Sequence, residues 1–210
     1  MRKIVVAVAI WAVVVPATMP AARAGDGPIS FGRRALHREW VAWAVGSNTN
    51  PLVDPAFCGE IVDGRFFLNL AGVLDGSYDC EIPAGVTIVA SAGYAIFWKP
   101  TDARSDQRLR HLLNQDLQHF GPSHGRLDGE VVDLEPSFAK TNVYRIAVGE
   151  DSLLQTADPD FPDERTHTKV AAGAWVFRIS GLAVGDHRLV VRQRVFGNPA
   201  KAVFRITITA

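Results

Sequence analysis

The second half of the chain consists of short apolar runs separated by turn residues. Runs of strand length occupy residues 130–134, 142–148, 174–179, 187–191 and 203–209. The last run alternates strictly, with Phe204, Ile206 and Ile208 on one side, which predicts a strand with one covered face and one wet face. The expected helices do not alternate with these runs, so the pattern favours sheets joined by turns over parallel βαβ units.

The first half opens with a segment that has helical spacing. Residues 34–45 place Leu36, Trp40 and Trp43 on one face, and Gly46 follows where a helix would end. We expect an amphipathic helix whose two tryptophans are part of the core, because the same face also carries aliphatic residues. An exposed aromatic platform for a sugar or peptide is the alternative.

A hairpin and two further strand-length runs follow. Asp63-Gly64 lies between residues 60–62 and 65–70, and this dipeptide is typical of a tight turn between two strands. Residues 86–90 and 94–98 are apolar runs that we expect to form two separate strands.

A second amphipathic helix is expected to begin with a cap at Thr101 or Asp102 and to end at Gly121-Pro122. Its apolar face would carry Leu109, Leu112, Leu113, Leu117 and Phe120. Together these elements predict an α+β protein that is mostly β, a β-sandwich with two amphipathic helices packed on it. We expect residues 25–210 to form one domain.

The first 24 residues have the pattern of a secretory signal peptide. A basic start is followed by an uncharged run over residues 4–15, and the small residues Ala22 and Ala24 precede Gly25. The apolar run is shorter than the roughly 20 residues that a membrane-spanning helix needs. We therefore expect cleavage after Ala24 and a secreted or cell-envelope protein without a transmembrane anchor.

The chain has equal numbers of acidic and basic residues, 22 of each. Removal of residues 1–24 would take away three basic residues and no acidic one, leaving a slightly acidic protein. Because nucleic-acid binding calls for an excess of basic charge, this balance argues against a nucleic-acid partner.

Cys58 and Cys80 are the only two cysteines. An even number of cysteines in a chain bound for an oxidising compartment predicts a disulfide. A pair this far apart is not a redox Cys-x-x-Cys motif, and two thiols are too few for a cysteine-rich zinc site.

The histidines and acidic residues form no recognisable catalytic or metal-binding motif. Histidines occur at positions 37, 111, 119, 124, 167 and 187 without metal-ligand spacing, and His187, at a turn, is expected to bond backbone. A weak Ca²⁺ site is conceivable in the acidic loop 150–164, which carries Asp158, Asp160, Asp163 and Glu164, but a solvated loop is favoured. Asp133 and Glu135 are expected to lie on one strand and to face the same way. We therefore assign no catalytic residue, metal or cofactor.

Residues 39–98 resemble a group of secreted bacterial proteins of unassigned function. The shared features are the tryptophan helix, Asn50-Pro51-Leu52-Val53-Asp54, Cys58, the strand from Phe67 to Gly72, Cys80 and Pro83-Ala84-Gly85. The C-terminal stretch with Gly173-Ala174-Trp175-Val176 and Gly185-Asp186-His187 is similar to the end of that group and of many Ig-like domains. The resemblance implies an architecture and an exported location, but no catalytic residue.

We thus expect an exported, non-catalytic binding or cell-envelope interaction protein with an unidentified ligand. The alternative is a secreted hydrolase whose site combines Asp133 and Glu135 with one of His111, His119 or His124. A close pair of perturbed carboxylates in a cleft would favour the enzyme, and a flat, aromatic-bearing face would favour binding.

Overall fold

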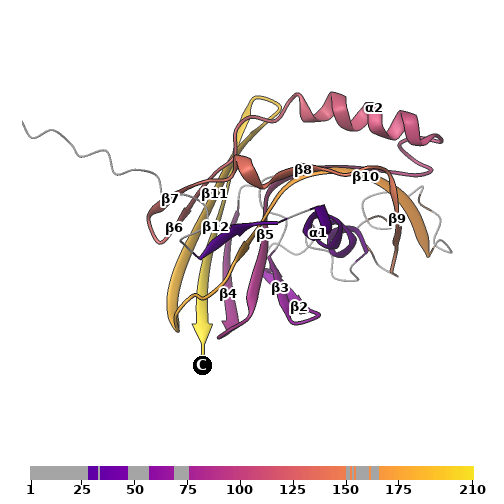
Figure 1. The fold of residues 1–210 in the computed structure, drawn as a ribbon. Coiled ribbons are helices and arrows are strands. Elements are labelled where there is room, and N and C mark those ends of the chain that lie inside the picture. The colour runs from indigo at the N-terminus through magenta and orange to yellow at the C-terminus, as the bar shows by residue number, and fades with distance from the viewer. Residues whose placement is uncertain are drawn as a thin grey trace, which may run out of the picture.

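The computed structural model describes residues 28–32, 34–46, 57–68, 76–149, 152, 154, 161 and 166–210. This part of the chain is mostly β, with two sheets and two α-helices, as the sequence predicts (Figure 1).

The first sheet is organised around one long strand, β10. In order across the sheet, the strands are β1 (Ile29–Phe31), β10 (His167–Ile179), β5 (Thr87–Trp98), β3 (Arg65–Leu68) and β2 (Gly59–Val62). Two short strands, β8 (Phe138–Lys140) and β9 (Tyr144–Ala147), also pair with β10. All pairs are antiparallel except β3 with β5. The turn at Asp63-Gly64 joins β2 to β3 and confirms the predicted hairpin.

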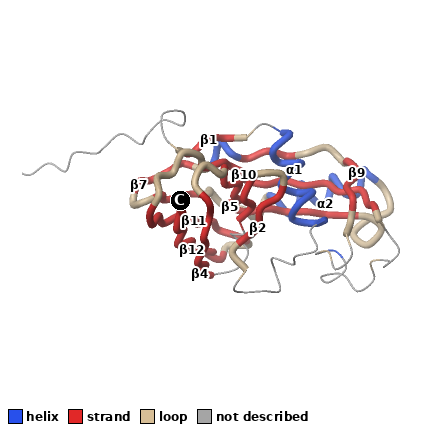
Figure 2. Tube along the Cα trace, turned by 90° about the horizontal axis from the view of Figure 1, so that it is seen from below, coloured by secondary structure: helices blue, strands red, loops and turns tan. Residues whose placement is uncertain are grey.

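The second sheet has the order β4 (Gly76–Pro83), β12 (Asn198–Thr209), β11 (Gly185–Val195), β6 (His124–Leu127) and β7 (Glu130–Asp133). The pairing of β4 with β12 is parallel and the others are antiparallel. Seen from below in Figure 2, β4, β11, β12 and β7 lie at one end of the molecule and β9 lies at the other.

One apolar cluster contains side chains from both sheets. Ile88 and Phe177 of the first sheet belong to it, together with Ile82, Leu189 and Phe204 of the second. The alternation predicted for the last strand is present, because Phe204, Ile206 and Ile208 are buried in this cluster.

Helix α1 (Arg34–Gly46) covers the opposite face of the first sheet. Trp40 is fully buried and Trp43 is 6% exposed, so both are core residues as expected. Trp40 packs against the ring of Tyr94 in β5, and Trp43 stacks on Phe67 in β3. His37 on the same helix face donates from Nε2 to the carbonyls of Ser137 and Ala174, 2.8 and 3.1 Å away.

Helix α2 (Asp106–Leu117) lies above β10, whereas α1 lies below it (Figure 1). Its cap is Ser105, not Thr101 or Asp102, because the Asp102 carboxylate instead accepts the backbone N–H of Trp98. Buried leucines of α2 pack against alanines of β5 and β10. Helix α2 thus covers one end of β5 and β10, and the second sheet covers the other end of the same two strands.

Strand β5 differs from the prediction, because it is one continuous strand across Ser91-Ala92-Gly93. A register shift in its pairing with β10 absorbs the irregularity, and the Ser91 hydroxyl bonds the backbone of Gly93. A Cβ at Gly93 would lie 1.5 Å from Oε1 of Gln193 in the second sheet, so any larger residue there would displace the end of this buried side chain.

Cys58 and Cys80 form the predicted disulfide, with their Cα atoms 5.5 Å apart. Neither described helix is long and apolar enough to cross a membrane.

Candidate functional site

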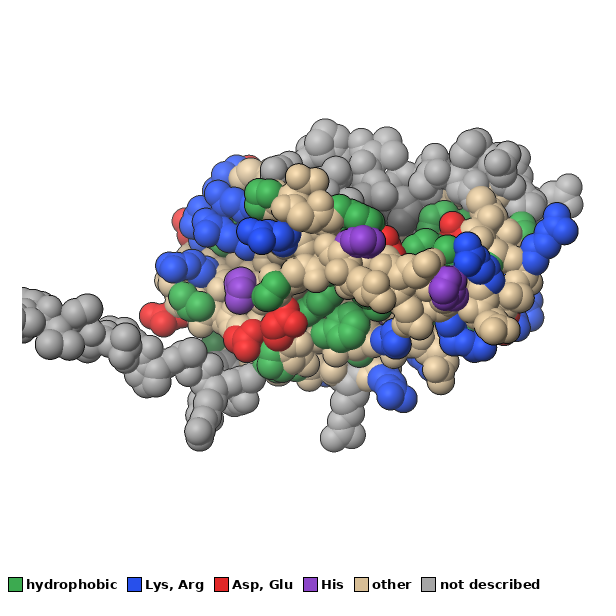
Figure 3. All heavy atoms as spheres, turned by 90° about the horizontal axis from the view of Figure 1, so that it is seen from above, with side chains coloured by type: hydrophobic (Ala, Val, Ile, Leu, Met, Phe, Trp, Pro, Cys, Tyr) green, Lys and Arg blue, Asp and Glu red, His purple; other side chains and the backbone are tan. Residues whose placement is uncertain are grey.

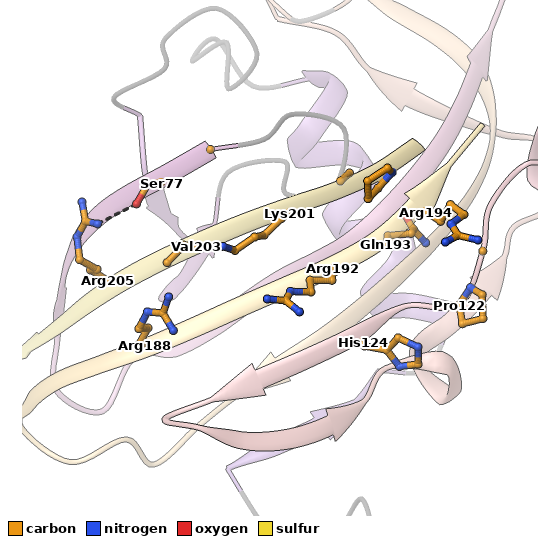
Figure 4. Close-up of a pocket in the computed structure, with 14 residues that line it drawn as sticks. Ser77, Pro122, His124, Arg188, Arg192, Gln193, Arg194, Lys201, Val203 and Arg205 are labelled. Carbon is orange, nitrogen blue, oxygen red and sulfur yellow. Dashed lines mark hydrogen bonds between the residues drawn. The ribbon is translucent and has the colours of Figure 1, made fainter. Parts of the chain in front are cut away.

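An open groove with a volume of about 1040 Å³ lies on the outer face of the second sheet. Its lining is dominated by basic side chains from β11 and β12, with His124 of β6 at its border (Figure 4). Five of these side chains are Arg188, Arg192, Arg194, Lys201 and Arg205. We call this surface the arginine groove. In Figure 3, Lys and Arg side chains gather at the left end of the molecule, the end where Figure 1 places β11 and β12.

The local sequence explains why the basic residues share one face. In β11, the buried Leu189 and Val191 alternate with the exposed Arg188 and Arg192. In the neighbouring strand β12, the exposed Lys201 and Arg205 alternate with the buried Ala202, Phe204 and Ile206. Since successive side chains of a strand point to opposite faces, the apolar set fills the core and the basic set faces outward.

The turn between β11 and β12 sets the register that brings basic residues opposite one another. Phe196 and Gly197 both have positive φ, 50° and 80°, as in the two-residue turns that join twisted strands. Arg192 then lies directly opposite Lys201, and Arg188 opposite Arg205. On its other side, Arg192 lies opposite His124 of β6.

Arg205 has a carboxylate partner among the described residues. Both oxygens of Asp79 in β4 accept hydrogen bonds from Arg205, and Ser77 accepts a third at 2.8 Å. The hydrogen bond from Arg205 holds the pKa of Asp79 below its usual range. For Arg188, Arg192 and Arg194, the described residues provide no ion pair. Like charges directly opposite on neighbouring strands, such as Arg192 and Lys201, repel each other unless they are compensated.

A half-exposed aromatic ring lies beside one end of the groove. Phe196 is 56% exposed, and its ring stacks on that of His119 with centroids 4.9 Å apart. Its N–H donates to the His119 carbonyl, and Gly121 N–H donates to the Arg194 carbonyl, so the segment after α2 is fixed against this hairpin. A phenylalanine with positive φ is uncommon, since this conformation suits glycine or asparagine.

The structure brings together part of the residues that the hydrolase alternative requires. His124 lies opposite Asp133 in the pairing of β6 with β7, and Glu135 follows shortly after. Asp133 and Glu135 do not share a strand, contrary to the prediction, because β7 ends at Asp133 and Glu135 begins a 3-10 turn that contains Pro136. His111 lies on α2, and His119 stacks on Phe196.

Both carboxylates are engaged with backbone groups. Asp133 accepts the N–H of Glu135 at 3.1 Å, and Glu135 accepts the N–H of Ser123. The buried Ser123 hydroxyl in turn accepts a hydrogen bond from the Gln193 amide at 2.6 Å. These bonds fix the connection between β7 and β8 under one end of the groove.

Two other predicted features have different outcomes. His187 bonds backbone as expected, with Nε2 2.9 Å from the Ala183 carbonyl, and its Nδ1 also contacts Asp128 at 2.7 Å. Asp158, Asp160, Asp163 and Glu164 of the acidic loop fall outside the described residues. Within the described part, no group of three or more His, Cys, Asp or Glu residues has the arrangement of a metal site.

The arginine groove was missed by sequence reasoning, although a signal for it was present. Basic residues at 188, 192 and 194, and again at 201 and 205, share the parity of a single strand face. Their opposition across the two strands depends on the register, which the turn at Phe196-Gly197 determines. Comparison of the chain with protein-family models, curated proteins and solved structures found no match.

Proposed function

We propose that this protein is an exported, non-catalytic binding protein that holds an anionic ligand in the arginine groove. The observation that supports this function is the unfavourable placement of cations in the free protein. Arg192 lies directly opposite Lys201, and Arg188, Arg192 and Arg194 project from one face of β11 without an ion pair to the described residues. An anion bound between these side chains would turn the repulsion into charge-assisted hydrogen bonds.

The architecture suits such a role. We propose that the two sheets form a β-sandwich, in line with the apolar cluster that they share. The outer face of one sheet then remains open for a ligand while its inner face supplies stability. In this arrangement, the groove is supported by a rigid, hydrogen-bonded surface, so its cations need little reorganisation on binding.

Export is part of the proposal and has its own test. The disulfide is consistent with an oxidising compartment. The mass of protein recovered from outside the cytoplasm should correspond to a chain that begins at Gly25. A full-length chain that requires detergent for its recovery would refute this part.

The groove is tested by a stability measurement and a binding measurement on the same variants. Arg192→Gln should stabilise the free protein by up to about 1 kcal/mol, because it removes one of two cations that lie directly opposite each other. The same change should weaken binding of sulfated and carboxylated polyanions, measured by calorimetry at low salt. Arg145→Gln is the matched control, since Arg145 is an exposed arginine on β9 in the other sheet. Equal effects of the two substitutions on binding would exclude the groove as the site.

The hydrolase alternative keeps one observation in its favour, the position of His124 opposite Asp133. The backbone hydrogen bonds of Asp133 and Glu135 favour structural roles for these carboxylates. Asp133→Asn should therefore leave ligand binding intact. If the wild type hydrolyses a bound polyanion and the Asp133→Asn variant does not, the hydrolase becomes the favoured function.

A further inference from the structure

We infer that the ligand of the arginine groove is a linear acidic polysaccharide that lies along β11. This inference deepens the proposed anion-binding function and rests on it.

The length of the basic surface favours an extended ligand. Arg188 and Arg194 are six residues apart on one strand face, which corresponds to about 20 Å at the usual rise of an extended chain. Arg192 lies between them, and Lys201 faces Arg192 from β12. One phosphate or carboxylate reaches only a part of this surface, whereas a chain with repeated charges is able to contact all of it.

Part of the lining between the two groups of cations is aliphatic. Val203 of β12 lines the groove, and Val190 of β11, directly opposite, is buried beside it. The Arg188–Arg205 pair lies on one side of these valines along the strands, and the Arg192–Lys201 pair on the other. A uronic acid ring presents C–H groups on its faces and a carboxylate at its edge, so it matches the apolar side chain of Val203 between cations.

The same lining argues against a single-stranded nucleic acid. Grooves that bind such strands carry aromatic side chains on which successive bases stack. Among the described residues that line the arginine groove there is no Phe, Tyr or Trp. Phe196 lies beyond Arg194, at the hairpin turn, where it could contact at most one end of the ligand.

The type of cation also matches carboxylate groups. Guanidinium groups donate two parallel hydrogen bonds to a carboxylate, and Arg188, Arg192 and Arg194 supply three such groups in line. Within the groove itself, Arg205 already donates two such hydrogen bonds to the carboxylate of Asp79. The positive charge that is available to a ligand therefore ends at Arg205.

The test measures the affinity of oligogalacturonates of increasing length by calorimetry at low salt, with inorganic phosphate and galacturonic acid as the shortest anions. The affinity per oligomer chain should rise with length until the chain spans about 20 Å, and it should stay constant for longer chains. Methyl-esterified oligomers, which keep the sugar and lose the charge, should not bind. Arg192→Gln should weaken binding of the long oligomer about tenfold or more, because one charge-assisted hydrogen-bonding group is lost. Arg145→Gln should leave this affinity unchanged. Arg192→Lys, which keeps the charge without the fork, should fall between them.

Each other outcome overturns a defined part of the argument. If no anion of any length binds, the proposed function itself fails. If phosphate or the monomer binds as tightly as the long oligomer, the groove is an anion site but the linear ligand is wrong. Tighter binding of oligothymidylate or polyglutamate than of oligogalacturonate of similar charge would replace the polysaccharide with that class. Unfolding curves of each variant establish that a lost affinity is not a lost fold.

Discussion

Cys58 and Cys80 connect an edge of one sheet to an edge of the other. Cys58 directly precedes β2, an edge strand of the first sheet, and Cys80 lies within β4, an edge strand of the second. Cys80 is 3% exposed and belongs to the apolar cluster that both sheets share. The bond therefore restrains the separation of the two sheets as well as the intervening chain.

Loss of this bond should lower the free energy of unfolding by roughly 2–4 kcal/mol, because the cysteines are 22 residues apart and close a loop of moderate length. Chemical denaturation of a Cys58→Ala, Cys80→Ala variant would measure the change. Reduced wild type should unfold near the variant's midpoint. If the oxidised and reduced wild-type proteins have the same midpoint, the cross-link contributes no stability.

Trp40 is the most deeply buried large side chain of α1, and its ring contacts Trp43 and Tyr94. Trp40→Ala should cost about 3–5 kcal/mol of stability through the cavity that it leaves. Ile61→Ala on β2 is the control, because Ile61 is 49% exposed and should change the midpoint little. Equal shifts for the two variants would contradict the packing of α1 on the sheet.

Gly93 of β5 lies in close contact with the side chain of Gln193 in β11. Gly93→Ala should destabilise the protein by about 1–3 kcal/mol, since the new methyl group overlaps the Gln193 amide in a buried position. Gln193→Ala in the same chain should recover part of that loss, which a double-mutant cycle by denaturation would detect. Strict additivity of the two substitutions would mean that they do not meet.

His187 makes part of the stability dependent on pH. Its hydrogen bond with Asp128, followed by that with the Ala183 carbonyl, raises the pKa of His187 above its ordinary value. The contribution of His187 to stability is complete below its pKa in the unfolded chain, about 6.5. This contribution is lost as pH rises through its pKa in the folded protein. The stability difference between wild type and His187→Gln should therefore shrink from near pH 6.5 upward.

Asp128 sets the other limit of this contribution. Burial alone would raise the pKa of Asp128, but the bonds from His187 and Arg188 outweigh it and lower the pKa. The contribution of the carboxylate is thus lost in acid, as pH falls through its folded-state pKa. Because Asp128 is 43% exposed, solvent screens the pair and the effect should be small. A pH-independent difference between wild type and His187→Gln would exclude the charged pair.

The sequence predicted the elements whose signals are local. Helix α1 and the hairpin at Asp63-Gly64 follow from side-chain spacing and turn chemistry over a few residues. Strand β5 was divided in two, because Gly93 and its small neighbours have the pattern of a loop. The need for this glycine comes from Gln193, a hundred residues further along the chain, and no local pattern contains that information.

The candidate site was hidden for a similar reason. Net charge over the whole chain is zero, so composition gave no sign that cations gather on one face. Their parity along β11 was readable, but the opposition of Arg192 to Lys201 requires the strand pairing. The buried tryptophans could be predicted because helical spacing alone defines their face.

The central position of β10 determines the order in which the chain is able to fold during synthesis. β10 pairs with β1, β5, β8 and β9, all of which precede it, and it begins only at His167. Likewise, β4 pairs with β12, which begins only at Asn198. The first sheet is not complete before β10 has been synthesised, nor the second before β12, so the two sheets should form late and not strand by strand. Until β10 and β12 emerge, β1 and β4 of the nascent chain lack the strands with which they pair, and this part of the chain remains open.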